Sequence, residues 1–418
     1  MGQGFIWICN CIKGENAMNI RRLTEEEINE AIDTVLKYRH YFHQYPELSG
    51  EEYHTSETIQ NFLREKQIEY TTGFAETGIL AIIKGDRPGK TIALRADIDA
   101  LPIEEEPSPS YRSKKERVMH ACGHDAHTAM LMSTAALLQK NKEELEGTVL
   151  CVFQPAEEQA PVGGAAKMLE DGLFEIYQPD AVLAQHVWPD LPVGQFGVMS
   201  GPIMGNSDRF EITIKGAGGH ASMPHQTKDS IVAAGQLIGQ IQSIISRNIN
   251  PLDAAVVTVG TIRGGERYNV IANETILEGT VRTFKDELKK RVKTKLGQLL
   301  AGIEASFEVT CHLKYFDGYP ATINTPLWAE HAREIARHLY GEESLPQVEP
   351  SLGGEDFARF LEKYPGNYHW LGTAIPERKV QKPLHDPSFD IDERALGYGI
   401  EFMYHEAVEG LKLLKGKG

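Results

Sequence analysis

Cysteine is scarce in this sequence, and its scarcity limits the class of protein that the chain can form. Five cysteines in 418 residues are too few and too irregularly spaced for a disulfide framework. They are Cys9, Cys11, Cys122, Cys151 and Cys311. This usage fits a reducing compartment, so we expect a cytoplasmic protein. Cys9 and Cys11 form a pair that could bind metal, but no second pair follows them, and we do not expect a site there.

Long apolar runs and an excess of basic residues are also lacking. No run of about 18 apolar residues occurs, so the sequence predicts no helix that spans a membrane. The apolar residues 5–9 are too few for a signal peptide, and we interpret residues 1–17 as an N-terminal appendage. The net charge of −16 argues against nucleic acids and anionic membranes as partners, because both require a basic surface. A small-molecule substrate is compatible with this charge.

The length and the order of the apolar segments predict an α/β protein of two domains. A chain of 418 residues is too long for one ordinary core. Thr24 and Glu27 form a capping-box pattern, which predicts a helix that continues to about Gln44. Further helices are expected at 51–66 and 126–140, strands at 78–84, 91–96, 148–153 and 181–184, and a turn at 85–89. The strand at 148–153 is almost entirely apolar, which predicts a sheet covered by helices on both faces.

A change of pattern between residues 205 and 315 predicts a second domain inserted into the first. Strands are expected at 209–215, 254–262, 275–284 and 306–313, with helices at 229–247 and 287–303. The order β-α-β-β-α-β is typical of a ferredoxin-like α+β domain. Helices near 326–340 and 355–363, a strand near 368–371 and a helix from about Asp392 then return to the first domain.

Histidine and cysteine gather in the segment from Met119 to His127. His120, Cys122, His124 and His127 fall within eight positions. A buried cysteine beside surface histidines would explain one such pair, but further candidate ligands follow at the ends of expected strands. Five residues together resemble a metal-binding set: Cys122, His124, Glu158, His186 and His385.

The number and spacing of these five residues favour a catalytic site with two ions. Five protein ligands are too many for one tetrahedral catalytic zinc, but they suit two ions that share a bridging ligand. The alternative is a closed zinc site that only stabilises the fold. Structural zinc sites usually draw their ligands from tight loops, whereas these are spread over roughly 260 residues.

Adjacent Glu157 and Glu158 follow the apolar strand and suggest two different roles. Side chains alternate along an extended chain, so one carboxylate would bind metal while the other faces the substrate. A metal ion lowers the pKa of bound water toward about 7, and a neighbouring carboxylate can take the proton during nucleophilic attack. This chemistry is metal-assisted hydrolysis.

Five segments of the chain resemble one known family. They are Arg39–Glu47, Arg95–Pro102, Met119–His127, Gln154–Glu158 and Gly218–His225. They are similar to the amidohydrolase branch of the aminoacylase and carboxypeptidase superfamily of dinuclear metallopeptidases. That branch includes hippurate hydrolases, N-acetyldiaminopimelate deacetylases and plant auxin-conjugate hydrolases. The resemblance covers about residues 24–410.

This resemblance implies a fold and an assembly. It implies a zinc-peptidase-like catalytic domain, formed by 18–204 and 316–418, with a mixed central sheet flanked by helices. It also implies that the ferredoxin-like insert at 205–315 is a dimerisation domain, so we expect a homodimer or a higher homo-oligomer.

The resemblance also implies roles for individual residues. Cys122, His124, Glu158, His186 and His385 are expected to bind two divalent ions per subunit, which could be Zn, Mn, Co or Ni. The expected general base is Glu157, and Asp97 is expected to orient a metal ligand. His220 is similar to a histidine that the insert of the partner chain contributes to polarise the scissile carbonyl group. Asn269 and Arg282 are similar to residues of the insert near the substrate, although ordinary polar strand residues are an equal alternative.

Two departures from the family pattern flank the expected site. The polar loop 107–117 lacks the glycine usually found just before the Met-His-Ala-Cys segment. Gln159–Val162 separate the two glutamates from Gly163 and Gly164, which usually follow more closely. These differences affect the expected substrate preference rather than the chemistry.

The sequence therefore predicts a metal-dependent amidohydrolase that acts on N-acyl amino acids or related amide conjugates. A dipeptidase or carboxypeptidase on the same scaffold is the nearest alternative. A catalytically silent metal-binding scaffold would be expected to lack a ligand or the base, yet all are present. A thiol enzyme with Cys122 as nucleophile and His124 as base would resist chelators and be sensitive to alkylation.

Overall fold

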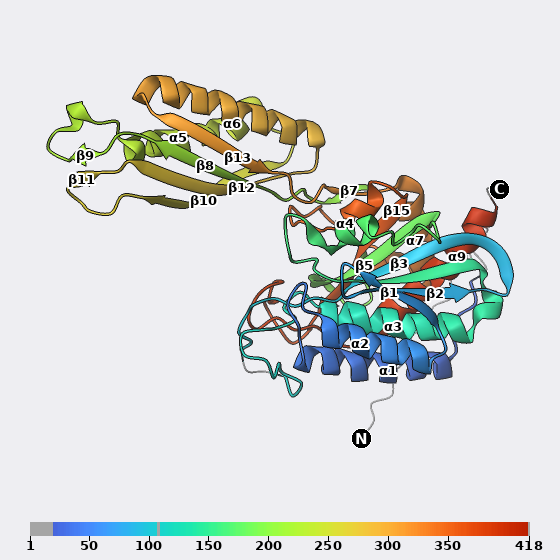
Figure 1. Ribbon diagram of the computed structural model, residues 1–418. Coiled ribbons are helices and arrows are strands. Elements are labelled where there is room, and N and C mark those ends of the chain that lie inside the picture. The colour runs from blue at the N-terminus through green and yellow to red at the C-terminus, as the bar shows by residue number, and fades with distance from the viewer. Residues whose placement is uncertain (1–19, 107–108, 417–418) are drawn as a thin grey trace.

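The computed structural model describes residues 20–106 and 109–416, and these form two large sheets with their covering helices and two short two-stranded sheets (Figure 1). The expected appendage at 1–17, with Cys9 and Cys11, lies outside the described residues. A seven-stranded mixed sheet forms the larger body, and a four-stranded antiparallel sheet extends away from it. Among the described helices, none combines the length and the apolar character needed to cross a membrane.

The larger sheet has the strand order β1-β2-β4-β3-β5-β15-β6. Its strands are β1 (Glu69–Phe74), β2 (Gly78–Lys84), β3 (Arg87–Asp97), β4 (Glu146–Gln154), β5 (Ala181–Pro192), β6 (Phe196–Gly197) and β15 (Gly366–Ala374). The four central strands β4, β3, β5 and β15 run parallel, whereas the outer pairings are antiparallel. The expected mixed sheet is therefore confirmed.

The expected turn at 85–89 is wrong in its second half. β3 already begins at Arg87, and β4 lies between β2 and β3 in the sheet. A Cβ atom on Gly89 would lie 1.9 Å from the carbonyl oxygen of Glu146, so the glycine serves close approach to β4 rather than a turn.

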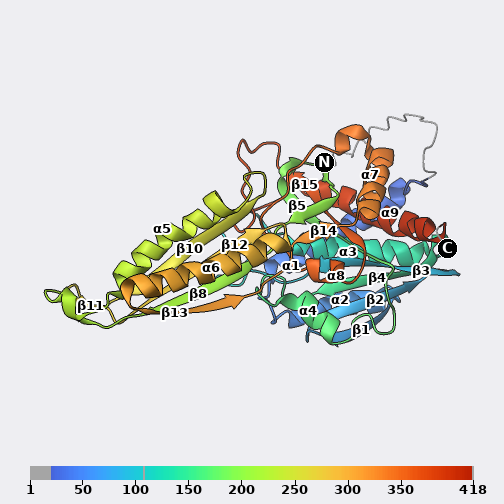
Figure 2. The ribbon, with the colours of Figure 1, turned by 90° about the horizontal axis from the view of Figure 1, so that it is seen from above.

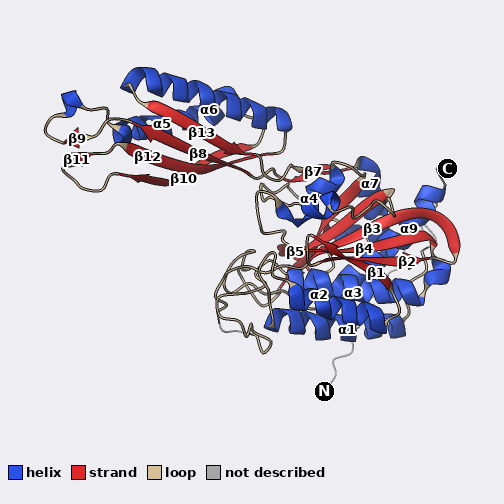
Figure 3. Ribbon diagram, viewed as in Figure 1, coloured by secondary structure: helices blue, strands red, loops and turns tan. Residues whose placement is uncertain are grey.

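Burial on both faces explains the apolar strands. In β4, Val149, Cys151 and Phe153 belong to one core, while Leu150 and Val152 belong to the other. The first core is covered by α1 (Glu25–Gln44), α2 (Tyr53–Glu65), α3 (His124–Lys140), α7 (Pro326–Tyr340) and α9 (Ala395–Lys415). The second is covered by α4 (Gly163–Glu170) and α8 (Ala358–Leu361). Figure 3 shows α1, α2 and α3 on one side of the sheet and α4 on the other.

Local signals in the sequence account for the first helix. Thr24 accepts a hydrogen bond from the Glu27 amide at 3.2 Å, and the Glu27 carboxylate accepts one from the Thr24 amide at 2.8 Å. The predicted capping box and the predicted end at Gln44 are both confirmed.

The smaller sheet has the order β10-β12-β8-β13, which is the ferredoxin-like arrangement. Its strands are β8 (Asp208–Lys215), β10 (Ala255–Gly264), β12 (Glu274–Thr283) and β13 (Thr310–Phe316). Helices α5 (Ser230–Asn248) and α6 (Asp286–Phe307) cover one face, as Figure 2 shows. The strand expected at 306–313 begins later, because α6 continues to Phe307 and ends at Glu308 with a left-handed φ of 53°.

Short elements mark the two ends of this extension. β7 (Gly201–Met204) pairs with β14 (Thr322–Asn324) at the junction with the larger body. β9 (Gly219–His220) pairs with β11 (Val270–Ile271) at the far tip in both views (Figures 1 and 2). The boundaries proposed at 205 and 315 remain a prediction.

Candidate metal centre

A glycine in the left-handed region places Cys122 and His124 on either side of a sharp bend. Gly123 has a φ of 84° and precedes the first residue of α3. A Cβ atom there would lie 2.4 Å from a methyl group of Val187, so the bend also needs the missing side chain. The thiol and the imidazole are thereby brought to the same end of the parallel strands.

Hydrogen bonds fix which nitrogen of each histidine is free. Nδ1 of His124 lies 2.9 Å from the carbonyl oxygen of Asp99, so it carries the proton. Its Nε2 is buried and has no hydrogen-bond partner among the described residues. In the same way, Nδ1 of His186 donates to the Val187 carbonyl oxygen at 2.7 Å. Its Nε2 faces the sulfur of Cys122 at 3.6 Å. Both histidines therefore direct a lone pair toward the same space.

The two glutamates lie in a turn after β4, not in extended chain. The premise of the alternation argument is therefore wrong. Ala156 adopts a left-handed φ of 54°, and its amide donates to the Glu52 carboxylate at 2.9 Å, so the chain bends before the pair. Glu157 nevertheless approaches Glu355 and Asp356, whereas Glu158 approaches Cys122 and His385.

Candidate ligand atoms form groups that share members. One group contains Cys122, Glu158 and His385, and a second contains His124, Glu157 and Glu158, with ligand atoms within 4.8 Å of one another in each group. A third contains Asp97, His124, His127 and His186. Because Glu158 and His124 each belong to two groups, the arrangement suits two neighbouring ions better than one.

The chemistry of these donors fits divalent metal ions. Oε1 of Glu158 is buried, lacks a hydrogen bond of normal geometry and lies 3.0 Å from Nε2 of His385. A sulfur, imidazole nitrogens and a carboxylate are the usual ligands of zinc and its first-row neighbours. His385 is half exposed, which leaves one side of the group open toward the cavity.

The charges around the site also favour bound metal ions, because several carboxylates surround Cys122 and Glu157. Burial raises the pKa of Cys122 well above its ordinary value, and the charges of Glu158 and Glu157 raise it further. Burial, followed by the charges of Glu355 and Glu158, likewise raises the pKa of Glu157 well above its ordinary value. Such surroundings favour a cation.

The pKa of His124 responds to the same field. Burial opposes its protonation, but the carboxylates of Asp97 and Asp99 more than offset this and raise the pKa to about 10. The environment therefore stabilises positive charge at this position, whether a proton or a metal ion carries it.

Asp97 lies beside His124 and His127, and its role as the residue that orients a ligand stays a prediction. Its Oδ1 accepts a hydrogen bond from Nδ1 of His127 at 2.6 Å, and its Oδ2 lies 3.6 Å from Nε2 of His124. Nε2 of His127 is itself occupied, because it accepts from the Val187 amide at 2.9 Å. The carboxylate in contact with Nδ1 of His124 is Asp99, at 3.2 Å.

A cavity of about 500 Å³ opens beside the candidate metal ligands. Cys122, Glu157, Glu158, His186 and His385 all line it. Its apolar lining comes from Ala160, Trp188, Met204, Leu352 and Leu384. The guanidinium of Arg282 enters it from β12 of the smaller sheet.

Two residues expected near the substrate do not line this cavity. His220 is exposed on β9, and its pairing partner Val270 directly follows the exposed Asn269. Both lie at the tip of the smaller sheet, on the far side from the larger body (Figures 1 and 2). Within one chain, therefore, only Arg282 of the three residues from the insert reaches the candidate site.

Three further residues at the site were not identified from the sequence. The carboxylate of Asp99 forms a hydrogen bond with Nδ1 of His124, and Glu355 lines the cavity. The third residue is Tyr319, whose hydroxyl donates to the Glu157 carbonyl oxygen at 2.6 Å. Asp99 stands in the Arg95–Pro102 motif, two residues after Asp97, so that motif could have indicated it. No local pattern marks Tyr319, because its role depends on a contact between distant segments.

Comparisons with known proteins agree with this geometry. Residues 93–408 match the model of peptidase family M20/M25/M40. The chain is 42% identical over 369 residues to N-acetyl-L-cysteine deacetylase of Bacillus subtilis, covering 88% of this chain and 86% of that protein. It is 38% identical over 384 residues to thermostable carboxypeptidase 1 of Saccharolobus solfataricus, covering 91% and 96%.

A solved structure supports the same relationship. The dinuclear metal-binding peptidase of the M20 family from Bacillus subtilis superposes with a TM-score of 0.80 at 38% identity, covering 92% of this chain and 99% of that one. The chain belongs to peptidase family M20/M25/M40. It is thus a metal-dependent hydrolase of amide bonds, and the resemblance inferred from its motifs is confirmed.

Proposed function

We propose that this protein is an amidohydrolase that removes the acyl group from N-acyl amino acids. The observation that carries the proposal is that Glu157 and four of the five candidate metal ligands line one cavity, while the fifth, His124, has a ligand atom within 4.8 Å of those of Glu157 and Glu158. The similarity to a deacetylase of N-acetyl-L-cysteine supports N-acetyl amino acids as the first substrates to test.

In this proposal Cys122, His124, Glu158, His186 and His385 hold two divalent ions. Bound there, the ions supply Lewis acidity and lower the pKa of water. The free Nε2 atoms of both histidines, fixed by hydrogen bonds at Nδ1, support this assignment. Asp99 keeps His124 in the required tautomer through its contacts with Nδ1.

Glu157 acts as the general base. Its carboxylate accepts a proton from the attacking water and returns it to the amide nitrogen as the carbon–nitrogen bond breaks. Its burial beside Glu355 and Glu158 raises its pKa, which makes the carboxylate a stronger proton acceptor than a glutamate in water.

Arg282 binds the substrate carboxylate. It is the cationic side chain that reaches the cavity from the smaller sheet, and a guanidinium matches a carboxylate in a bidentate pair. The apolar walls near Trp188 and Leu352 are suited to uncharged parts of the substrate.

His220 polarises the scissile carbonyl group of the partner chain, with Asn269 beside it. Its location at the tip of the insert supports action in a second subunit rather than in its own. A two-fold dimer makes the exchange reciprocal, with the insert at 205–315 as the dimerisation domain.

Subunit exchange tests this arrangement. Chains with His220→Ala and chains with Glu157→Ala are each expected to be nearly inactive. In a random mixture, each mixed dimer has one site with both residues intact, so about a quarter of native activity should return. Mixed dimers without recovered activity would rule out the role in trans.

The cellular location and the metal belong to the proposal as well. Among the described residues, Cys122, Cys151 and Cys311 are free thiols, which supports work in a reducing cytoplasm. A site with sulfur, nitrogen and oxygen ligands accepts Zn, Mn, Co or Ni.

A substrate panel decides the function. Metal-free protein is reconstituted separately with each of the four metals and assayed against N-acetyl amino acids, N-benzoyl amino acids and dipeptides. Faster turnover of N-acyl amino acids than of dipeptides is expected. Preference for dipeptides would assign the chain to the peptidase alternative, and no turnover with any metal would contradict the proposal.

A further inference from the structure

The peptide unit between the general base and its neighbouring ligand is held at both ends. The Glu158 amide donates to Oδ2 of Asp99 at 2.9 Å. On the other side, the carbonyl oxygen of Glu157 accepts a hydrogen bond from the Tyr319 hydroxyl at 2.6 Å. The Asp99 contact holds the Glu158 end of this peptide unit, and the Tyr319 contact holds the Glu157 end.

Tyr319 comes from a different part of the molecule. It lies in the segment that returns from the smaller sheet, between β13 and β14, and it is 3% exposed. Its backbone is joined to the outgoing segment, because the Ser207 amide donates to the Tyr319 carbonyl oxygen at 3.0 Å. The Tyr319 amide in turn donates to the Ser207 hydroxyl at 3.2 Å. The two connections to the insert are therefore bonded to each other at Tyr319.

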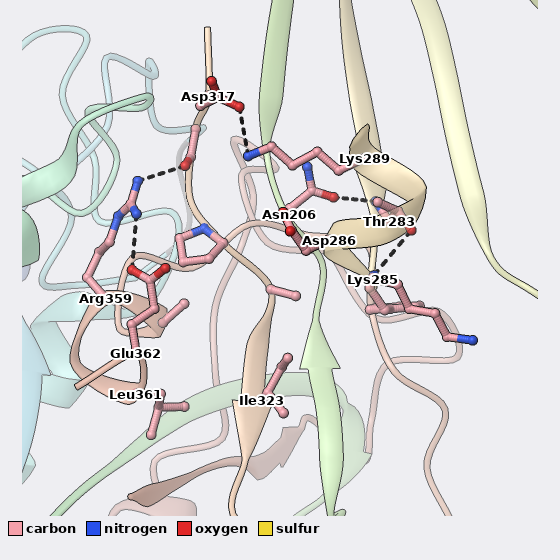
Figure 4. Close-up of a pocket in the computed structure, with 15 residues that line it drawn as sticks. Asn206, Thr283, Lys285, Asp286, Lys289, Asp317, Ile323, Arg359, Leu361 and Glu362 are labelled. Carbon is pink, nitrogen blue, oxygen red and sulfur yellow. Dashed lines mark hydrogen bonds and ion pairs between the residues drawn. The ribbon is translucent and has the colours of Figure 1, made fainter. Parts of the chain in front are cut away.

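Neighbouring contacts secure this junction to both bodies. Arg359 of α8, on the larger body, donates to the Gly318 carbonyl oxygen at 2.8 Å. Lys289 of α6 pairs with Asp317 at 3.0 Å. Figure 4 shows these two basic side chains reaching the returning segment from opposite sides. A displacement of the insert would therefore be transmitted through Asp317 and Gly318, the two residues before Tyr319.

The loop that carries the glutamates leaves space for the tyrosine ring. A Cβ atom on Gly163 would lie 2.9 Å from Cε1 of Tyr319, and Gly163 has a φ of 70°. A Cβ atom on Gly164 would lie 1.8 Å from the carbonyl oxygen of Pro155. Gly163 thus leaves room for the phenol beside the turn that holds Glu157, while Gly164 lets the chain pass close to the Pro155 carbonyl oxygen.

We propose that Tyr319 is a positioning residue that couples the orientation of the insert to the placement of the Glu157 carboxylate. The inference rests on the proposed function, in which Glu157 is the general base. The insert carries both Arg282 and His220, which are proposed to contact substrate. Through the hydrogen bond from Tyr319 to Glu157, the orientation of the insert would also determine where the general base lies. If Tyr319 only filled space, its ring would suffice and the loss of its hydroxyl would not affect Glu157.

Tyr319→Phe removes the hydroxyl and keeps the ring. We expect kcat to fall about tenfold, because a misplaced base lowers the rate of the chemical step. KM and bound metal should stay within about twofold of native values, since the ligands and Arg282 are untouched. Tyr315→Phe is the matched control, because Tyr315 lies at the same junction and donates to Asp208 at 2.7 Å instead of to the catalytic turn. It should leave kcat unchanged.

A double variant separates positioning of Glu157 from a general effect on structure. In a Glu157→Gln background, Tyr319→Phe should reduce the residual kcat less than twofold, because the base that it positions is already gone. The same tenfold loss in both backgrounds would overturn the inference, as would an unchanged kcat in the single variant. Loss of bound metal in Tyr319→Phe would overturn it too, because the tyrosine would then act on the ligand Glu158. Full activity of Glu157→Gln alone would instead refute the proposed function.

Discussion

The carboxyl group of Glu52 should make the metal-free protein less stable as the pH rises. Glu52 is buried, and its pKa is raised from 4.5 to about 7, first by burial and then by the charge of Asp99. Below pH 4.5 the group is protonated in both the folded and the unfolded protein. Between about pH 4.5 and 7 the unfolded protein releases this proton more readily, so folding stability falls. Above pH 7 the loss is constant.

The size of this effect follows from the two pKa values. Each pKa unit corresponds to about 1.36 kcal/mol, so ionised Glu52 destabilises the fold by about 3 kcal/mol above pH 7. At pH 5.5 the same relation gives roughly 1.4 kcal/mol. Glu52→Gln keeps an acceptor for the Ala156 amide, now bonded at 2.9 Å, and removes the charge. The variant should therefore gain stability over the native chain as the pH increases.

Thermal unfolding of chelator-treated protein between pH 5.5 and 8.5 measures this gain. The advantage of Glu52→Gln should grow by about 2 kcal/mol across this range. The control is Glu57→Gln, an exposed position in α2, the helix that directly follows Glu52, for which we expect a difference below about 0.5 kcal/mol at every pH. A Glu52→Gln variant whose stability relative to the native chain does not depend on pH, or falls at pH 8.5, would refute the reasoning.

Two further perturbations test the surroundings of the site. Arg95→Met leaves the buried carboxylates of Asp97, Glu355 and Asp356, now 2.8, 3.0 and 3.0 Å from the guanidinium, without their cation. The free energy of unfolding of this variant, measured in urea titrations, should be about 3–5 kcal/mol lower than that of the native chain. An unchanged free energy of unfolding would show that the ion pairs of Arg95 do not stabilise the fold. For Cys122, burial and the neighbouring carboxylates keep the thiol protonated in the metal-free protein, so the test is metal content: Cys122→Ala should bind less metal than the native chain, as followed by mass spectrometry. A native metal content in this variant would remove Cys122 from the ligand set.

Patterns that depend on neighbouring residues could be predicted from the sequence. The capping box at Thr24 and Glu27 sets the start of α1, and the apolar run in β4 indicates burial on both faces. The order of strands and helices in the insert likewise follows from local periodicity, and its ferredoxin-like sheet agrees.

Features that depend on distant contacts could not be predicted in this way. The bend at Ala156 involves a hydrogen bond to Glu52, 104 residues away, so the glutamate pair was placed in extended chain. The contact between Tyr319 and Glu157 joins residues 162 positions apart, and no local sequence pattern predicts it. The position of β4 between β2 and β3 depends on the whole sheet, so it could not be predicted from the residues of the segment 85–89.

The two adjacent glutamates provide the most direct test of the central claim, that Glu157 is the base and Glu158 a ligand in a metal-dependent amidohydrolase. Glu157→Gln and Glu158→Gln are compared for bound metal by mass spectrometry and for kcat on an N-acetyl amino acid. Glu157→Gln should retain both ions and lose activity by about a hundredfold or more, whereas Glu158→Gln should lose metal. Equal loss of metal in the two variants, or native activity in Glu157→Gln, would contradict the account.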